Sequence, residues 1–260
     1  MSLLTASEQR FTLREETERN VTIQLDNVCV RYRVQRERFS TLKEYVIRML
    51  QRRVDHEEFW ALQDVNITVH KGEVFGVIGR NGSGKSTLLK VVARVLGPTV
   101  GRVRVKGRVA PLLECGAGFH PELTGRENIF LNGTLLGFTR KEMRERFERI
   151  VTFAELRDFI DAPLRTYSSG MAARLGFAIA TDEKPDVLLV DEVLAVGDET
   201  FQRKSTARMQ EFREQGTTIL LVSHNMKTVE GMCKRAMWLD RGVVKADGAS
   251  GEVVSAYLGR

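Results

Sequence analysis

The chain has 260 residues, which is enough for one large domain or two small ones with a sizeable core. Its hydrophobic content of 42% and charged content of 28% are typical of a soluble globular protein, and its apolar runs are too short to span a bilayer. The N-terminus lacks a signal-peptide core, and the three cysteines have no metal-ligand spacing. We therefore expect a protein of the reducing cytoplasm.

The net charge of +6 comes from one segment. Eight Lys or Arg residues and two Glu residues lie between Arg31 and Arg53, so this window alone accounts for the excess. A basic segment confined to one place indicates a local anionic partner and argues against a protein that coats nucleic acid. A solvated charged face is the alternative.

The N-terminal third is predicted to contain a lead, a strand and a helix. Residues 1–20 are polar, and residues 21–32 have the alternation and β-branched residues of a strand. Residues 40–53 change to a helical period, with apolar positions on one side and basic ones on the other. This segment predicts an inserted basic amphipathic helix that meets anionic headgroups or phosphorylated lipid carriers, with an ordinary core-packed helix as the alternative.

Strands and helices then alternate along the chain. Strand character appears at residues 60–70 and 73–79, around 101–114, and at 186–190 and 217–223; helices are expected at 86–96, over much of 124–181 and at 251–258; a hairpin is expected at 236–250. The strands at 186–190 and 217–223 are apolar without alternation, so both faces should be covered. The pattern predicts an α/β fold with a mainly parallel sheet.

A complete G-x-x-x-x-G-K-[ST] pattern follows one of these strands and opens a helix. It and the next residue comprise Gly79, Arg80, Asn81, Gly82, Ser83, Gly84, Lys85, Ser86 and Thr87. Glycines let backbone N–H groups surround phosphate oxygens, and the helix N-terminus adds positive charge. Lys85 can reach the β- and γ-phosphates, and the Ser86 hydroxyl can ligate Mg²⁺. We interpret this loop as a nucleoside triphosphate site, against the alternative of a merely flexible glycine loop.

Acidic and histidine side chains follow two later strands. Asp191 and Glu192 come directly after the apolar run 187–190, and His224 follows the run 217–223. Ligands of parallel α/β sheets bind where strands end, so Asp191 is the expected Mg²⁺ partner, and Glu192 can polarise the water that attacks the γ-phosphorus. His224 is expected to contact the γ-phosphate, and a structural histidine is the alternative.

A short polar turn, Tyr167-Ser168-Ser169-Gly170-Met171, precedes a helix-forming run. Such residues can simply cap the helix, because a side-chain oxygen accepts the N–H groups that the first turn leaves free. The same N–H groups can also bind phosphate.

The order of these four elements resembles the nucleotide-binding domain of ATP-binding cassette (ABC) transporters, over about residues 21–258. The resemblance implies a P-loop NTPase with a RecA-like core, a small antiparallel β-subdomain and a helical subdomain at about 124–181, all within a domain at 21–260. Ser168 and Gly170 match the family's signature motif. By resemblance they contact the γ-phosphate of ATP held by the other subunit of a homodimer. Gly197-Asp198 corresponds to its D-loop.

YSSGM together with "LLECGAGFHPELTGRENI" and "VDEVLAVGDE" looks like the subfamily that exports lipid-linked polysaccharide. This implies a peripheral ATPase at the cytoplasmic face of the inner membrane, working with a polytopic transmembrane permease. The inserted segment 40–53 resembles one on the membrane-facing side of such exporters. Another ABC transporter class and a soluble ABC ATPase are the alternatives.

Two family positions stay open. The family's loop Gln, which contacts Mg²⁺ and water, is matched by Glu114 or by Cys115. The aromatic residue that stacks on adenine is matched by Tyr32, with Trp60 as the rival.

Overall fold

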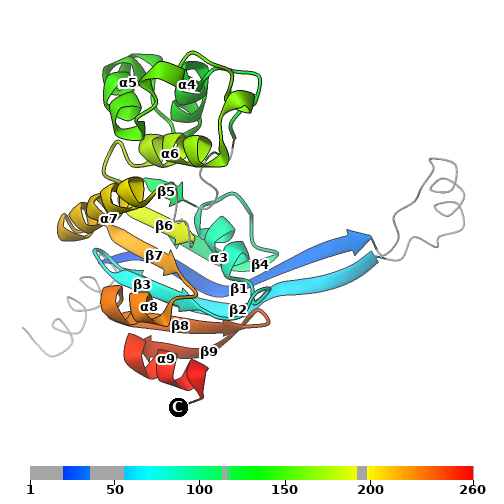
Figure 1. The fold of residues 1–260 in the computed structure, drawn as a ribbon. Coiled ribbons are helices and arrows are strands. Elements are labelled where there is room, and N and C mark those ends of the chain that lie inside the picture. The colour runs from blue at the N-terminus through cyan, green and yellow to red at the C-terminus, as the bar shows by residue number, and fades with distance from the viewer. Residues whose placement is uncertain (1–19, 36–55, 113–115, 117, 192–197, 260) are drawn as a thin grey trace, which may run out of the picture.

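The computed structural model describes residues 20–35, 56–112, 116, 118–191 and 198–259. Within them the chain forms two sheets and a group of helices, which lies to one side of the sheets in Figure 1. The basic helix expected at 40–53 lies outside the described residues, as does the polar lead at 1–20 apart from Asn20.

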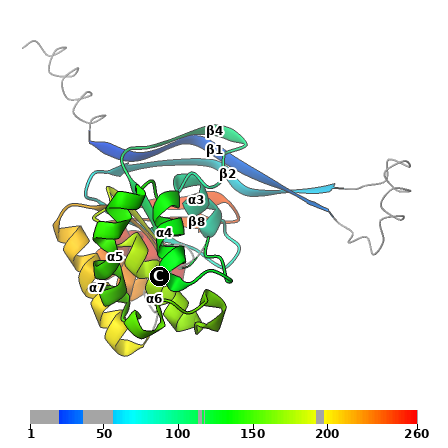
Figure 2. The same ribbon diagram turned by 90° about the horizontal axis from the view of Figure 1, so that it is seen from above.

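A three-stranded antiparallel sheet contains β1 (Val21–Gln35), β2 (His56–His70) and β4 (Val100–Val105), in the order β2-β1-β4. Apolar residues on one face of β1 and β2 enter the core and exclude water from it. Pairing continues to Gln35 and His56, beyond the strand expected at 21–32, and Figures 1 and 2 show the two strands leaving the body as a ribbon.

The second sheet has six strands in the order β5-β6-β7-β3-β8-β9. They are β3 (Val74–Ile78), β5 (Val109–Leu112), β6 (Val187–Asp191), β7 (Thr218–Val222), β8 (Arg235–Asp240) and β9 (Val243–Ala249). All are parallel to their neighbours except β9, which forms a hairpin with β8. Every residue of β7 and the first four of β6 are buried, as their unbroken apolar runs predict, and every residue of β3 is buried as well. The predicted mainly parallel α/β fold is confirmed.

Four helices of the described ranges belong to this core: α3 (Lys85–Val92), α7 (Glu199–Glu214), α8 (Met226–Met232) and α9 (Ser250–Leu258). The sequence placed the end of the first helix at residue 96, but α3 ends at Val92. Arg94 has a left-handed φ of 61°, and its side chain donates a hydrogen bond to the carbonyl of Val105. The chain therefore leaves the helix at Arg94, and the side chain of this residue is bonded to β4.

The helical group contains α4 (Gly125–Leu135), α5 (Arg140–Ala154) and α6 (Ser169–Ala180), with short 3₁₀ turns η1 (Arg157–Phe159) and η2 (Leu164–Thr166). Reciprocal side-chain and backbone hydrogen bonds cap α4 and α5 at their N-termini, through Thr124 with Glu127 and Thr139 with Glu142. The group has an apolar core of its own. In Figure 1, α6 lies on the side of this group that faces the six-stranded sheet, and Phe177 of α6 packs into the core of that sheet.

Candidate functional site

The ends of three neighbouring parallel strands bring the predicted residues together. The loop at 79–84 follows β3, Asp191 ends β6, and His224 follows β7, which lies between the other two. One cavity of about 550 Å³ opens at this edge. It is lined by Tyr32, Phe59, Ala61, Asn81, Gly82, Gly84, Lys85, Ser86, Thr87, Asp191 and His224.

The loop needs its glycines because neighbouring backbone lies very close. A Cβ on Gly79 would lie 2.1 Å from the carbonyl oxygen of Leu239, and one on Gly84 would lie 2.5 Å from that of Ala61. Both have positive φ, at 151° and 107°. A side chain at either position would displace the loop, so the glycines allow its close approach to the neighbouring backbone.

Gly79, Arg80 and Ser83 do not themselves line the cavity. Ser83 is 3% exposed, and its Oγ has no hydrogen-bond partner among the described residues. Its amide donates to the carbonyl of Arg80, at 3.1 Å. Within the loop itself, the cavity is therefore lined by Asn81, Gly82 and Gly84.

Lys85 is buried and fixed inside the loop. Its Nζ donates hydrogen bonds to the carbonyl oxygens of Gly79 at 2.8 Å and Arg80 at 2.9 Å. Burial lowers the pKa of the Lys85 ammonium, and the charge of Asp191 opposes that shift. The side chain thus holds a positive charge at the N-terminus of α3, where phosphate oxygens can take over its hydrogen bonds.

Ser86 and Asp191 present oxygen ligands side by side. The hydroxyl of Ser86, on α3, donates to Oδ2 of Asp191, at the end of β6, over 3.2 Å. A hydroxyl and one carboxylate next to a phosphate site are the donor set that Mg²⁺ uses when substrate oxygens and water complete its shell. No cluster of three or more His, Cys, Asp or Glu is found in the described ranges, so a cage built by the protein alone is absent there. The residues present fit Mg²⁺ carried with a nucleotide.

His224 lines the same cavity from the end of β7. Burial lowers the pKa of its imidazole first, the nearby positive charge of Lys85 lowers it further, and Asp191 acts in the opposite direction. The neutral imidazole is therefore favoured at pH 7, which lets it donate one hydrogen bond without adding charge.

Tyr32 and Phe59 form the aromatic end of the cavity, and Trp60 is outside it. Tyr32 pairs with Phe59 across β1 and β2, whereas Trp60 pairs with Arg31, whose guanidinium lies 5.3 Å from the centre of its ring. Of the two adenine-stacking candidates, only Tyr32 reaches the site.

A β-bulge brings Phe59, which was not predicted, into the site. Val30 pairs with Leu62, and the next residue of β1 pairs with Trp60, so Ala61 is an extra residue on β2. Strict alternation from buried Leu62 would have placed Trp60 on the inner face. The extra residue places Phe59 there instead. No signal in the sequence marks this bulge.

Ser168 and Gly170 do not line this cavity in the same chain. Ser168 caps α6: its Oγ accepts a hydrogen bond from the amide of Met171 at 3.2 Å, as the capping interpretation predicts. A Cβ on Gly170 would meet only that Oγ, at 3.9 Å, so nothing else in the described part of this chain requires glycine there. Tyr167, by contrast, serves its own subunit, donating to the carbonyl of Phe159 at 2.7 Å.

Other predicted residues are described in part or not at all. Asp198 caps α7, accepting a hydrogen bond from the amide of Phe201 at 2.9 Å. Glu192, Glu114, Cys115 and Gly197 lie outside the described residues.

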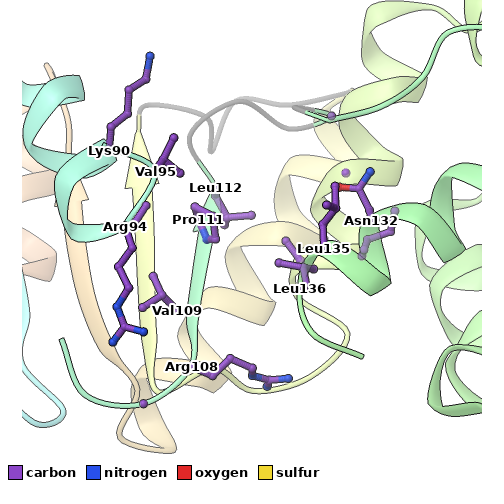
Figure 3. Close-up of a pocket in the computed structure, with 16 residues that line it drawn as sticks. Lys90, Arg94, Val95, Arg108, Val109, Pro111, Leu112, Asn132, Leu135 and Leu136 are labelled. Atoms are coloured by element: carbon purple, nitrogen blue, oxygen red, sulfur yellow. The ribbon is translucent and has the colours of Figure 1, made fainter. Parts of the chain in front are cut away.

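A second cavity of about 670 Å³ lies between β5 and α3 on one side and α4 and α6 on the other (Figure 3). Val95 and Leu135, which are 71% and 68% exposed, are among its lining residues. Lys90, Arg94 and Arg108 add positive charge, and none of the predicted nucleotide-site residues that the structure describes lines it. This cavity is therefore a separate surface.

The fold and the first cavity define a phosphate-loop nucleotide-binding cassette. A family model described as ABC transporter matches residues 62–195. A dimeric ATP-binding cassette in a post-hydrolysis state bound to ADP and Pi shares the fold, with a TM-score of 0.68 and 22% identity over 88% of this chain and 99% of that chain. The chain belongs to the ABC transporter family.

Several relatives are named for glycan export. The O-antigen export system ATP-binding protein RfbB of Klebsiella pneumoniae is 52% identical over 77% of this chain and 81% of its own length. RfbB of Myxococcus xanthus is 49% identical over 87% of this chain, which spans only 53% of that protein. The teichoic acids export ATP-binding protein TagH of Lactococcus lactis is 46% identical over 78% of this chain and 43% of its own length. The predicted family and the predicted likeness to polysaccharide exporters are confirmed.

Proposed function

We propose that this chain hydrolyses ATP with Mg²⁺ and, as a homodimer, drives export of a lipid-linked polysaccharide through a separate transmembrane permease. The observation that carries the proposal is the single cavity that joins Lys85, Ser86, Asp191 and His224. The names of the exporter relatives support the substrate class, and a transport role in turn calls for a membrane partner.

Each residue has a role in phosphoryl transfer to water. Lys85 and the loop amides hold the phosphates, and Ser86 and Asp191 hold Mg²⁺, which neutralises charge on the β- and γ-phosphates when bound. Glu192 polarises the attacking water and takes its proton, while neutral His224 donates a hydrogen bond to the γ-phosphate. Most of the rate acceleration then comes from position and charge.

The dimer completes the site. The exposed turn at Ser168 offers the N-terminus of α6 to an anion, and the space around Gly170 allows a phosphate to approach. We assign these residues to the ATP of the partner subunit. ATP then holds two subunits together, and its hydrolysis releases them.

The remaining contacts face the membrane. We assign the second cavity to the permease, because exposed apolar side chains such as Val95 and Leu135 mark surfaces for protein contacts. The basic segment 40–53 is assigned to anionic lipid at the cytoplasmic face of the inner membrane, and no role in nucleic-acid binding is proposed. Glu114 is assigned to Mg²⁺ and water, with Cys115 as the rival at that position. No helix in the described ranges is long and apolar enough to cross a membrane.

Two measurements test the proposal. The purified chain should release phosphate from ATP only with Mg²⁺ present, and Lys85→Ala should weaken ATP binding by about tenfold or more. Cells depleted of this chain should accumulate lipid-linked glycan on the cytoplasmic side. Unchanged ATP affinity in Lys85→Ala would contradict the phosphate-loop assignment, and unchanged export would contradict the transport role.

A further inference from the structure

We propose that Phe59 is a base-contacting residue that joins Tyr32 in a two-ring platform under the base of the bound nucleotide. The proposal rests on the nucleotide site proposed above and adds to it a residue that selects for the presence of a base. The two-ring platform also determines which bases the site accepts.

The position of Phe59 is the first observation that supports a contact with the base. It is the direct cross-strand partner of Tyr32, and both line the cavity that contains Lys85 and Ser86. Directly opposed residues of an antiparallel pair point to the same face, with Cβ atoms about 5 Å apart. Two rings at that spacing form a continuous apolar surface about the width of a purine.

The exposure of Phe59 to solvent is the second observation that supports this contact. Phe59 is 53% exposed, which is the largest exposed fraction among the three aromatic residues at this end of β1 and β2. Tyr32 and Trp60 are both 36% exposed, and the ring of Trp60 has Arg31 against it. Burying an exposed ring against a flat ligand removes apolar surface from water and adds stacking.

The third observation concerns the polar groups that line the cavity near the two rings. The side chains around the two rings within the described residues offer one polar group, the Tyr32 hydroxyl, and the other polar side chains belong to the phosphate end. A site that hydrogen-bonds the edge of its ligand rejects analogues by 10⁴-fold or more, whereas a stacking surface accepts any flat base. The platform should therefore accept guanine nearly as well as adenine.

The test compares ligands with and without a base. Binding of ATP, GTP and inorganic tripolyphosphate to the full chain is measured by equilibrium dialysis, with wild type, Phe59→Ala, Phe59→Tyr and Trp60→Ala. Trp60→Ala is the matched control, because it removes the adjacent aromatic residue on the opposite face.

In wild type, ATP and GTP should bind within about tenfold of each other, since stacking reads no edge pattern. Phe59→Ala should weaken both by about tenfold and leave tripolyphosphate unchanged, because alanine substitution of a base-stacking ring costs roughly 5- to 100-fold. Phe59→Tyr should restore binding, and Trp60→Ala should match wild type.

Three results would overturn the proposal. They are unchanged ATP binding in Phe59→Ala, an equal loss in Trp60→Ala, and rejection of GTP by several orders of magnitude in wild type. Failure of wild type to bind either ATP or tripolyphosphate is a different result. It would remove the nucleotide site itself, and with it the proposed function, so the two failures are distinguished.

Discussion

The Oγ of Ser86 lies 3.2 Å from Oδ2 of Asp191, although 105 residues separate them in the chain. One belongs to the first turn of α3 and the other to the last residue of β6. The strand order brings them together, because β7 alone separates β6 from β3, the strand that leads into the phosphate loop and α3. Each residue leaves an oxygen facing the phosphate end of the cavity.

Asp191→Asn should therefore weaken the response to Mg²⁺. The amide keeps a hydrogen-bonding oxygen but loses the charge, so the Mg²⁺ concentration for half-maximal ATP hydrolysis should rise by about ten- to a hundredfold. Steady-state hydrolysis over a Mg²⁺ titration measures this. Asp186→Asn, a carboxylate that instead accepts a hydrogen bond from the amide of Arg108, is the control and should keep the wild-type midpoint. An unshifted midpoint in Asp191→Asn would exclude it as a metal ligand.

The pKa of His224 lies below its ordinary value, which fixes the sign of a pH effect. The imidazole is neutral above that pKa and becomes protonated as the pH falls through it. Hydrolysis should therefore fall on the acid side, with a midpoint below about 6.5. In His224→Gln that acid limb should disappear while kcat drops at pH 7.5. A pH profile of kcat for both proteins decides the matter, and an identical acid limb in the variant would assign it to another group.

Glu192→Gln should bind ATP but not turn it over. The amide cannot take a proton from the attacking water, so kcat should fall by about 10²-fold or more while ATP affinity stays within about twofold. In the presence of ATP, a dimer of this variant should also accumulate, and size-exclusion chromatography should detect it. Near-normal hydrolysis would disprove the role of general base.

Gly170→Ala should separate folding from catalysis. A Cβ at this position meets nothing closer than 3.9 Å in its own chain, so thermal stability should stay within about 1 °C, whereas hydrolysis should fall about tenfold or more if a partner's phosphate must approach there. Gly125→Ala is the opposite case. Its Cβ would lie 2.3 Å from the Tyr167 hydroxyl, and overpacking should cost about 1–3 kcal/mol of unfolding free energy. Full ATPase activity in Gly170→Ala would argue against a contact in trans.

Reversal of Arg48 and Arg52 to Glu should damage export more than soluble ATP hydrolysis. Each Lys or Arg near an anionic membrane surface contributes about 1 kcal/mol of attraction, and charge reversal turns this into repulsion. Glycan export in cells and phosphate release by the purified chain are compared. Equal losses in both assays would favour a purely structural helix at 40–53.

The elements that were predicted correctly are those encoded by local chemistry. The loop at 79–86 is recognisable from its glycines, which close backbone contacts require. Asp191 and His224 are recognisable because they follow apolar runs that form buried strands. Ser168 as a helix cap follows from the preference of the first turn for a side-chain oxygen.

The features that were not predicted depend on pairing between distant segments. The end of α3 is accompanied by a hydrogen bond from Arg94 to β4, a strand that follows it in the chain. The second cavity forms only when α4 and α6 approach β5 and α3. The position of Phe59 depends on a bulge that only the pairing of β1 with β2 reveals.

That bulge has a consequence for how the nucleotide site can change. Two aromatic residues, Phe59 and Trp60, follow one another on β2, and the extra Ala61 decides which ring faces the phosphate loop. If Ala61 instead paired with Arg31 in a regular ladder, Trp60 would pair with Tyr32, and phenylalanine would be exchanged for tryptophan without altering either side chain. The aromatic surface offered to the nucleotide is thus set by whether one residue of β2 is left out of the strand pairing, so a change that flattens the bulge would alter base binding while both rings stay in the sequence.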